Sequence, residues 1–182
     1  MIARDITKIG TLGNTINEPN CTTLAIKGNF GESAGLVSFS TFEQAAEALI
    51  DEEIDAMAVP YAYPNGYKLI MNKSLLVSDI FTFIIPSLVF GSKEPNAKAE
   101  YKILFNHAAT DPLVNEINAE WGNQVHVNSN SAACLNVLEN TDSCCAITNS
   151  ACAQQYGLYS HQILRAAIKM PFVVFIKNRK YT

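Results

Sequence analysis

The stretch SFSTFEQAAEALIDEEIDAMAVP, residues 38–60, decides the fold, because residues 128–148, NSNSAACLNVLENTDSCCAIT, repeat its pattern. Each copy has hydroxyl residues, an Ala-Ala pair that opens an apolar periodic stretch, an acidic turn and a short apolar run. Ala46 and Ala58 correspond to Ala133 and Ala146, so the two spacings differ by a single residue. Two related helix-turn-strand units predict two similar α/β lobes, and small ligands tend to bind in a cleft between lobes.

The first half of the chain predicts short strands around one helix. Lys8–Gly13 and Leu36–Phe39 are predicted strands, whereas residues 14–34 predict no element. Ser40–Glu43 has the pattern of a capping box, in which the serine hydroxyl bonds the amide of Glu43. The helix that follows is expected to run to about residue 51. A strand over residues 56–59 then ends at a proline.

The second half predicts a similar alternation of strands and helices. Leu75–Ile85 is strongly β-forming and long enough to cross between lobes. The further expectations are strands at 101–105, 125–127 and 172–176, and helices at 111–121 and 150–156, the last closed by Gly157. Alternating elements favour an α/β fold. Residues 1–83 with 159–182 are expected to form lobe 1 and residues 84–158 lobe 2, joined by two crossings that act as a hinge.

Composition narrows the classes of function. The 182 residues are 48% hydrophobic and 16% charged, with a formal charge of −4, which favours a folded globule and no nucleic-acid partner. No apolar run approaches the 18 residues of a membrane span. Residues 1–5 lack the apolar region of a signal peptide, so the cytosol is expected. Five cysteines and three histidines show no zinc-ligand spacing, and the predicted metal content is none.

The ordered motifs resemble the prephenate dehydratase-like family over roughly residues 8–177. The matching residues are Thr11-Leu12-Gly13, Phe42–Ala45 with Asp55–Pro60, Asn130–Ala133, Ala146-Ile147 and Gln155–Leu158. The resemblance implies a two-lobed fold of the type II periplasmic-binding-protein kind, with a ligand cleft between the lobes.

Two stretches of this chain differ from the motifs of prephenate dehydratases and favour one branch of the family. Dehydratases have Val-Pro-Ile-Glu-Asn-Ser and Thr-Arg-Phe, whereas this chain has Val59–Tyr63 (VPYAY) and Lys169–Phe172 (KMPF). The first stretch is similar to the non-aromatising prephenate decarboxylases of bacilysin-type biosynthesis. The usual Gly-Pro-x-Gly-Thr turn reads Gly13–Asn17 (GNTIN) here, and the usual Ser-His-Pro reads Asn106–Ala108 (NHA).

Candidate site residues follow from the expected strand ends and helix starts. The turn Asn128-Ser129-Asn130-Ser131 opens a helix, so its amides and macrodipole favour a carboxylate, although Ser131 or Asn130 can instead be only an N-cap. Thr11, Gly13 and Asn14 end the first strand and are expected to bind substrate. Lys169 is a candidate carboxylate partner, with solvent exposure the alternative.

Three residues are candidates for catalysis. His107 ends a predicted strand and can donate a hydrogen bond or a proton, unless it is a surface or packing histidine. Tyr61 and Tyr63 follow Pro60 at the expected hinge, where either can bond the substrate hydroxyl, shuttle a proton or simply pack.

The resemblance therefore implies an enzyme that removes CO2 from prephenate, a small dicarboxylate, and keeps the ring hydroxyl. No cofactor is expected, because the cyclohexadienyl ring itself accepts the electrons. The alternatives are an inactive or retargeted small-acid-binding protein of the same fold and, with less support, a prephenate dehydratase. No membrane partner is expected, and a homodimer is an open possibility.

Overall fold

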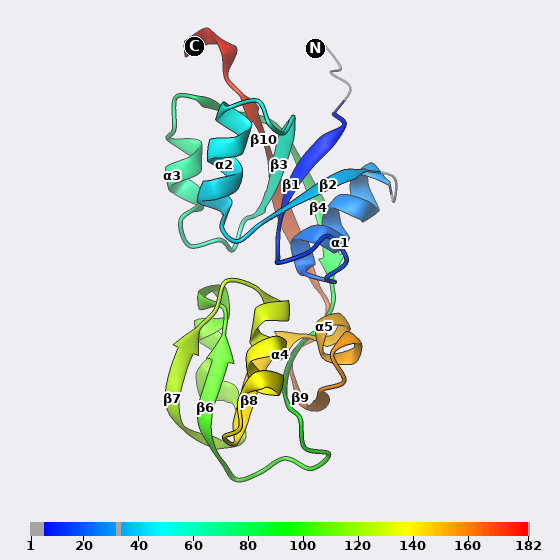
Figure 1. The fold of residues 1–182 in the computed structure, drawn as a ribbon, viewed down its shortest axis with the longest axis vertical. Coiled ribbons are helices and arrows are strands. Elements are labelled where there is room, and N and C mark those ends of the chain that lie inside the picture. Colours follow the sequence, from blue (N-terminus) through cyan, green and yellow to red (C-terminus); the bar gives the residue numbers. More distant parts are fainter. Residues whose placement is uncertain (1–5, 32–33, 182) are drawn as a thin grey trace. The chain divides into compact units, whose positions relative to one another are not determined.

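The computed structural model describes residues 6–31 and 34–181, which form two compact units (Figure 1). Of the described residues, unit 1 comprises 6–16, 22–31, 34–83 and 169–181, and unit 2 comprises 17–21 and 84–168. The chain therefore enters unit 2 twice, first for the short segment Asn17–Cys21. Residues 1–5, on which the expectation about a signal peptide depended, lie outside the described residues.

Unit 1 is built on a five-stranded sheet in the order β2-β1-β3-β10-β4. β1 runs parallel to β2 and β3, and β10 runs antiparallel to β3. The strands are β1 (Lys8–Leu12), β2 (Gly35–Phe39), β3 (Ala56–Pro60), β4 (Leu75–Ile85) and β10 (Ile168–Lys177). The last strand thus returns to the first sheet, where Phe172 pairs with Pro60.

The helices of unit 1 are α1 (Cys21–Phe30), α2 (Phe42–Ile50) and α3 (Gly66–Ile70). The apolar periodic stretch that follows the Ser40–Glu43 pattern forms the buried face of α2, where Phe42, Ala45, Ala46 and Leu49 are enclosed. The cap differs by one position from the prediction. Thr41, not Ser40, is the N-cap, and its hydroxyl accepts a hydrogen bond from the amide of Gln44 at 3.2 Å.

Unit 2 repeats this topology in the order β7-β6-β8-β5-β9. β6 is parallel to β7 and β8, while β5 is antiparallel to β8 and β9. The strands are β5 (Leu88–Ser92), β6 (Glu100–Asn106), β7 (Glu120–His126), β8 (Cys144–Asn149) and β9 (Tyr159–Arg165). The repeat seen in the sequence therefore corresponds to the pairs α2–β3 and α4–β8.

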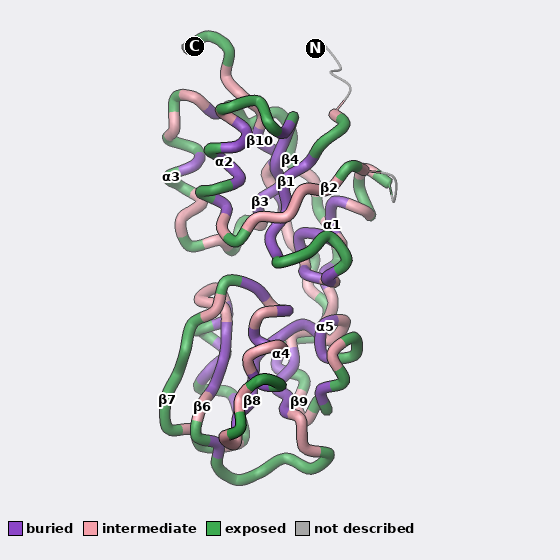
Figure 2. Tube along the Cα trace, in the orientation of Figure 1, coloured by how far each residue is buried: buried purple, intermediate pink, exposed green. Residues whose placement is uncertain are grey.

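The helical segments of unit 2 are the 3₁₀ helix η1 (Ala108–Glu116), α4 (Asn130–Glu139) and α5 (Ser150–Gln155), and a second 3₁₀ turn, η2 (Arg179–Tyr181), ends the described chain in unit 1. Gly157 closes α5 with a φ of +68°, as predicted. Cys144 and Cys145 are buried, and both thiols lie in cores formed with α4, η1 and the neighbouring strands. Figure 2 shows that β8 and the carboxyl-terminal end of β6 are buried, whereas β7 is exposed apart from Trp121.

The structure corrects three expectations about elements. The predicted helix at 111–121 is wrong, because η1 ends at Glu116 and Trp121 lies on β7, paired with Tyr101. Pro112 would lie in the first turn of the predicted helix, where proline is tolerated, so the proline does not explain the difference. Pairing with β6 makes residues 120–126 a strand instead. Helix α1 was not predicted. β9 pairs with β5, so the chain returns to unit 1 at Lys169 rather than at residue 159.

Candidate functional site

The carboxyl ends of three neighbouring parallel strands meet at one edge of the unit 2 sheet. Asn106 ends β6, His126 ends β7 and Asn149 ends β8. Ligands of open α/β sheets bind outside the carboxyl ends of the strands. Asn106 and Asn149 are fully buried. Since buried polar groups require partners, their hydrogen bonds define what this edge can bind.

Helix α4 begins at this edge, directly after β7. Its N-cap is Ser129, whose hydroxyl accepts from the amide of Ala132 at 3.0 Å. Ser131, in the first turn, is fully buried. The Ser131 hydroxyl lies 2.6 Å from Glu18 Oε2, and its amide donates to Asn20 Oδ1 at 3.1 Å. Ser129, expected to bind substrate, therefore caps the helix, and Ser131 contacts the segment 17–21.

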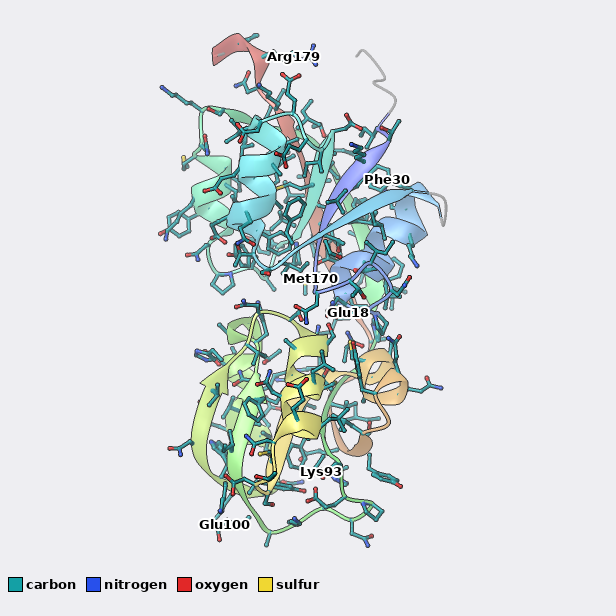
Figure 3. The ribbon with its side chains drawn as sticks, in the orientation of Figure 1. Glu18, Phe30, Lys93, Glu100, Met170 and Arg179 are labelled. Carbon is teal, nitrogen blue, oxygen red and sulfur yellow. The ribbon has the colours of Figure 1, made fainter. Side chains whose placement is uncertain are left out.

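Glu18 places a carboxylate at the start of α4 (Figure 3). Its side chain is 3% exposed, and Oε2 accepts hydrogen bonds from the Ser131 hydroxyl and from Asn20 Nδ2 at 3.0 Å. A carboxylate here is favoured by the helix macrodipole and by the first-turn donors. The anion-binding character predicted for this turn is thus used by an acid of the chain itself. Any external carboxylate at Ser131 has to compete with Glu18.

The segment Asn17–Cys21 is bound to unit 2 by further contacts. Asn149 Nδ2 donates to the carbonyl of Pro19 at 3.0 Å, and Cys152 Sγ lies 3.4 Å from the same oxygen. Asn130 Nδ2 lies 3.5 Å from Cys21 Sγ. Burial, followed by the negative charge of Glu18, raises the pKa of Tyr156 to about 12. These contacts hold Glu18 against α4. Asn128, the remaining member of the predicted turn, is exposed.

His107 follows β6 and caps η1. Its Nδ1 accepts from the amide of Ala109 at 3.1 Å, which fixes the lone pair on Nδ1 and the proton of the neutral ring on Nε2. Burial lowers the pKa of His107, and the charge of Asp111 offsets this only in part. At neutral pH His107 is therefore a neutral imidazole whose Nε2–H can donate a hydrogen bond.

A second polar group at this edge was missed by the sequence analysis. Asp111 Oδ1 accepts hydrogen bonds from Asn106 Nδ2 at 2.8 Å, Gln124 Nε2 at 3.0 Å and His126 Nε2 at 2.8 Å. Burial tends to raise the pKa of Asp111, but the bonds from Asn106 and His126 outweigh it and lower the pKa overall. The sequence signal was limited to the position of His126 in the strand predicted at 125–127.

The predicted residues of unit 1 lie around the end of β1. Thr11 is fully buried, and its hydroxyl lies 3.0 Å from that of Thr23 on α1. Gly13 has a φ of +136°, a conformation that favours glycine, and donates its amide to Phe39 O at 3.1 Å. Asn14 is exposed. Thr11 and Gly13 thus contribute to packing and turn geometry, and their role in substrate binding stays a prediction.

The two tyrosines after Pro60 differ in their surroundings. Tyr61 is 76% exposed. Tyr63 packs edge-on against Phe42 with ring centroids 4.8 Å apart, and its hydroxyl donates to the Glu43 carboxylate at 2.7 Å. Burial, together with that bond, raises the pKa of Tyr63 to about 12, which makes it a weak proton donor.

The basic candidates near the last strand are exposed. Lys169 lies near the start of β10. Arg165, on β9, forms a two-pronged ion pair with Glu116 of η1, so its guanidinium is already engaged within unit 2.

Two features are absent from the described residues. No group of three or more His, Cys, Asp and Glu side chains there is placed to hold a metal ion. Within residues 6–31 and 34–181, no helix has both the length and the hydropathy needed to cross a bilayer.

The architecture defines the class of protein as an α/β protein with a type II periplasmic-binding-protein-like fold. A prephenate dehydratase from Arthrobacter aurescens, solved with L-Phe, superimposes with a TM-score of 0.67 at 17% identity, covering 94% of this chain and 60% of that one. The methionine-binding protein MetQ superimposes with a TM-score of 0.58 at 14% identity, covering 96% and 84%.

Sequence comparison narrows this class. The chain is 30% identical over 128 residues to a prephenate decarboxylase from Planktothrix agardhii, covering 66% of this chain. It spans 62% of that relative's length. No protein-family model matches the chain. The sequence match and the shared fold confirm the predicted resemblance to the prephenate dehydratase-like family.

Proposed function

We propose that this protein is a carboxy-lyase that releases CO2 from prephenate and retains the ring hydroxyl. The observation that carries the proposal is the 30% identity to the prephenate decarboxylase of Planktothrix agardhii. The sequence Lys169–Phe172 supports it further, because this stretch has neither the threonine nor the arginine of the dehydratase motif. Without an acid to protonate the leaving hydroxyl, the ring is not expected to aromatise.

The reaction requires only redistribution of electrons and one proton transfer. The bond between the ring and its carboxylate breaks, CO2 leaves, and the electron pair enters the diene. A proton then adds to a ring carbon, and the hydroxyl stays in place. The protein has to bind the anionic groups, orient the ring and supply that proton. A neutral donor such as the Nε2–H of His107 suits the keto or hydroxyl oxygen of the substrate.

The test is incubation of the purified protein with prephenate, followed by mass spectrometry and ultraviolet spectroscopy of the products. Loss of CO2 with the hydroxyl retained is the expected result. Phenylpyruvate formed faster than in a protein-free control would instead identify a dehydratase. Unchanged prephenate would exclude both lyase activities on this substrate.

A second candidate function is a small-acid-binding protein without catalysis. Glu18 weakens the lyase proposal, because its buried carboxylate occupies donors at Ser131 that this proposal assigns to the substrate. The structural neighbours include proteins named for, or solved with, methionine and L-Phe. Calorimetric binding of prephenate without turnover would support this candidate.

We further propose a cellular location, a type of pathway and an oligomeric state for the protein. The similarity of Val59–Tyr63 to decarboxylases of secondary metabolism suggests a cytosolic role in antibiotic or peptide biosynthesis. A homodimer is part of the same proposal, and sedimentation at micromolar concentration tests it.

A further inference from the structure

Two histidines lie side by side at the carboxyl edge of unit 2. β6 and β7 are parallel, Asn106 pairs with His126, and His107 follows Asn106 directly. Asp111, on η1, reaches back to the end of β7 and lies 2.8 Å from His126 Nε2. Groups from three elements therefore converge at an edge where α/β sheets commonly bind ligands.

Asp111 is held in one orientation by several donors. Asn106 Nδ2 and Gln124 Nε2 both donate to Oδ1, and Gln124 Nε2 also lies 2.9 Å from Asn106 Oδ1. Asn106 is itself fully buried, which makes it a rigid anchor. These donors stabilise the charged carboxylate, in accordance with the lowered pKa of Asp111.

The two imidazoles consequently carry different hydrogen bonds at their Nδ1 and Nε2 atoms. An ionised carboxylate only accepts hydrogen bonds, so His126 donates Nε2–H to Asp111 and keeps Nδ1 as the nitrogen that exchanges a proton. His107 instead accepts at Nδ1 and carries its proton on Nε2. The His126 side chain is 54% exposed, so Nδ1 can meet both a ligand and solvent.

We propose that His126, oriented by Asp111, delivers the proton that quenches the ring after CO2 has left. This inference rests on the proposed lyase function. The Nδ1–H bond of the His126 imidazolium breaks, its proton bonds to the ring carbon that carries the electron pair, and neutral His126 regains a proton from solvent. Asp111 is a positioning residue, and His107 is a neutral hydrogen-bond donor. The titratable groups facing His126 are Asp111 from η1 and His107 from the end of β6.

The experiment measures CO2 release from prephenate by wild-type protein and by His126→Gln, Asp111→Asn and Glu120→Gln. Glu120 is exposed at the other end of β7 and serves as the matched control. His126→Gln should lower kcat by about 100-fold with little change in KM, since general acid catalysis contributes on this scale. Asp111→Asn should lower kcat by about tenfold and shift the pH profile. Glu120→Gln should match the wild type.

Two further readouts separate a chemical role from a structural one. Free imidazole should restore part of the activity of His126→Ala. Nitrogen NMR should show the Nε2–H tautomer of His126 in the wild type and its loss in Asp111→Asn. A fully active His126→Gln protein, or a His126 tautomer unaffected by Asp111→Asn, would overturn the inference. A wild type that releases no CO2 would instead refute the proposed function, and the donor assignment with it.

Discussion

Replacing Glu18 by alanine should destabilise unit 2 and create a site for a small carboxylate. The Glu18 side chain is 3% exposed, and its Oε2 receives bonds of 2.6 Å from Ser131 and 3.0 Å from Asn20. Hydrogen bonds to charged groups contribute about 1.5–3 kcal/mol each, so the two together represent roughly 3–6 kcal/mol. The carboxylate is no longer desolvated in the variant, and water can reach its donors. We therefore expect a net loss of about 2–4 kcal/mol.

The assay is urea denaturation of the wild type, Glu18→Ala and Glu139→Ala. Glu139 is exposed at the other end of α4, so its removal should change the free energy of unfolding by less than about 0.5 kcal/mol. Formate should then stabilise Glu18→Ala but neither other protein. With 100 mM formate and a dissociation constant near 10 mM, the expected gain is about 1.4 kcal/mol.

A double-mutant cycle tests whether Ser131 is the hydrogen-bond partner of Glu18. Ser131→Ala should cost about 1.5–3 kcal/mol in the wild type, because it removes a donor from a buried charge, but much less in Glu18→Ala. Additive effects of the two substitutions, or a Glu18→Ala protein as stable as the wild type and indifferent to formate, would refute the argument.

Two smaller predictions concern unit 1. Thr41→Ala should lower the free energy of unfolding by about 1 kcal/mol, because the N-cap hydrogen bond from the amide of Gln44 is lost. Ser40→Ala should have little effect. Equal effects of the two substitutions in urea denaturation would contradict the assignment of Thr41 as the N-cap. The hydroxyl of Thr7 and the amide of Lys8 lower the pKa of Asp55 in the folded protein. Ionised Asp55 therefore stabilises the fold above about pH 4, which is the pKa of an aspartate in the unfolded chain. This stabilisation is lost as the pH falls through the lower pKa of the folded protein. Asp55→Asn should flatten the dependence of Tm on pH below pH 4, and an unchanged acid limb would contradict this.

Local patterns predicted the parts of the fold that local forces determine. The apolar face of α2 and the glycine at the end of α5 both depend on residues within a few positions of one another. The repeat predicted two units, because each copy carries its own helix-strand signal. Helix α1 was missed because its sequence, Cys21–Phe30, has weak amphipathic character and no acid in its first turn. Its burial against the sheet, with Ile26 fully enclosed, supplies the stabilisation instead.

The site was harder to predict, because its contacts join distant segments. Trp121 lies on a strand that pairs with β6, whereas the helical spacing of apolar residues over 111–121 predicted a helix. His126 fell within the strand predicted at 125–127, but the sequence did not show which strand it pairs with. Asp111 acquires its role only when η1 brings it to the end of β7. His107 was found because a strand end is visible in the sequence, but its tautomer depends on the backbone of η1.

The two repeated helices show why the anion site was assigned to a substrate. Helix α2 has an acid in its first turn, Glu43, whereas the first turn of α4 has none. The amides and macrodipole at the start of α4 therefore remain available to an acid from elsewhere, and the substrate was the candidate. In the structure the acid is Glu18, 113 positions before Ser131. If Ser131 also binds the substrate, the tethered carboxylate competes with it, and Glu18→Ala should bind prephenate more tightly than the wild type does. An affinity that is unchanged in calorimetry would place the substrate carboxylates elsewhere and leave Glu18 as a structural anion of α4.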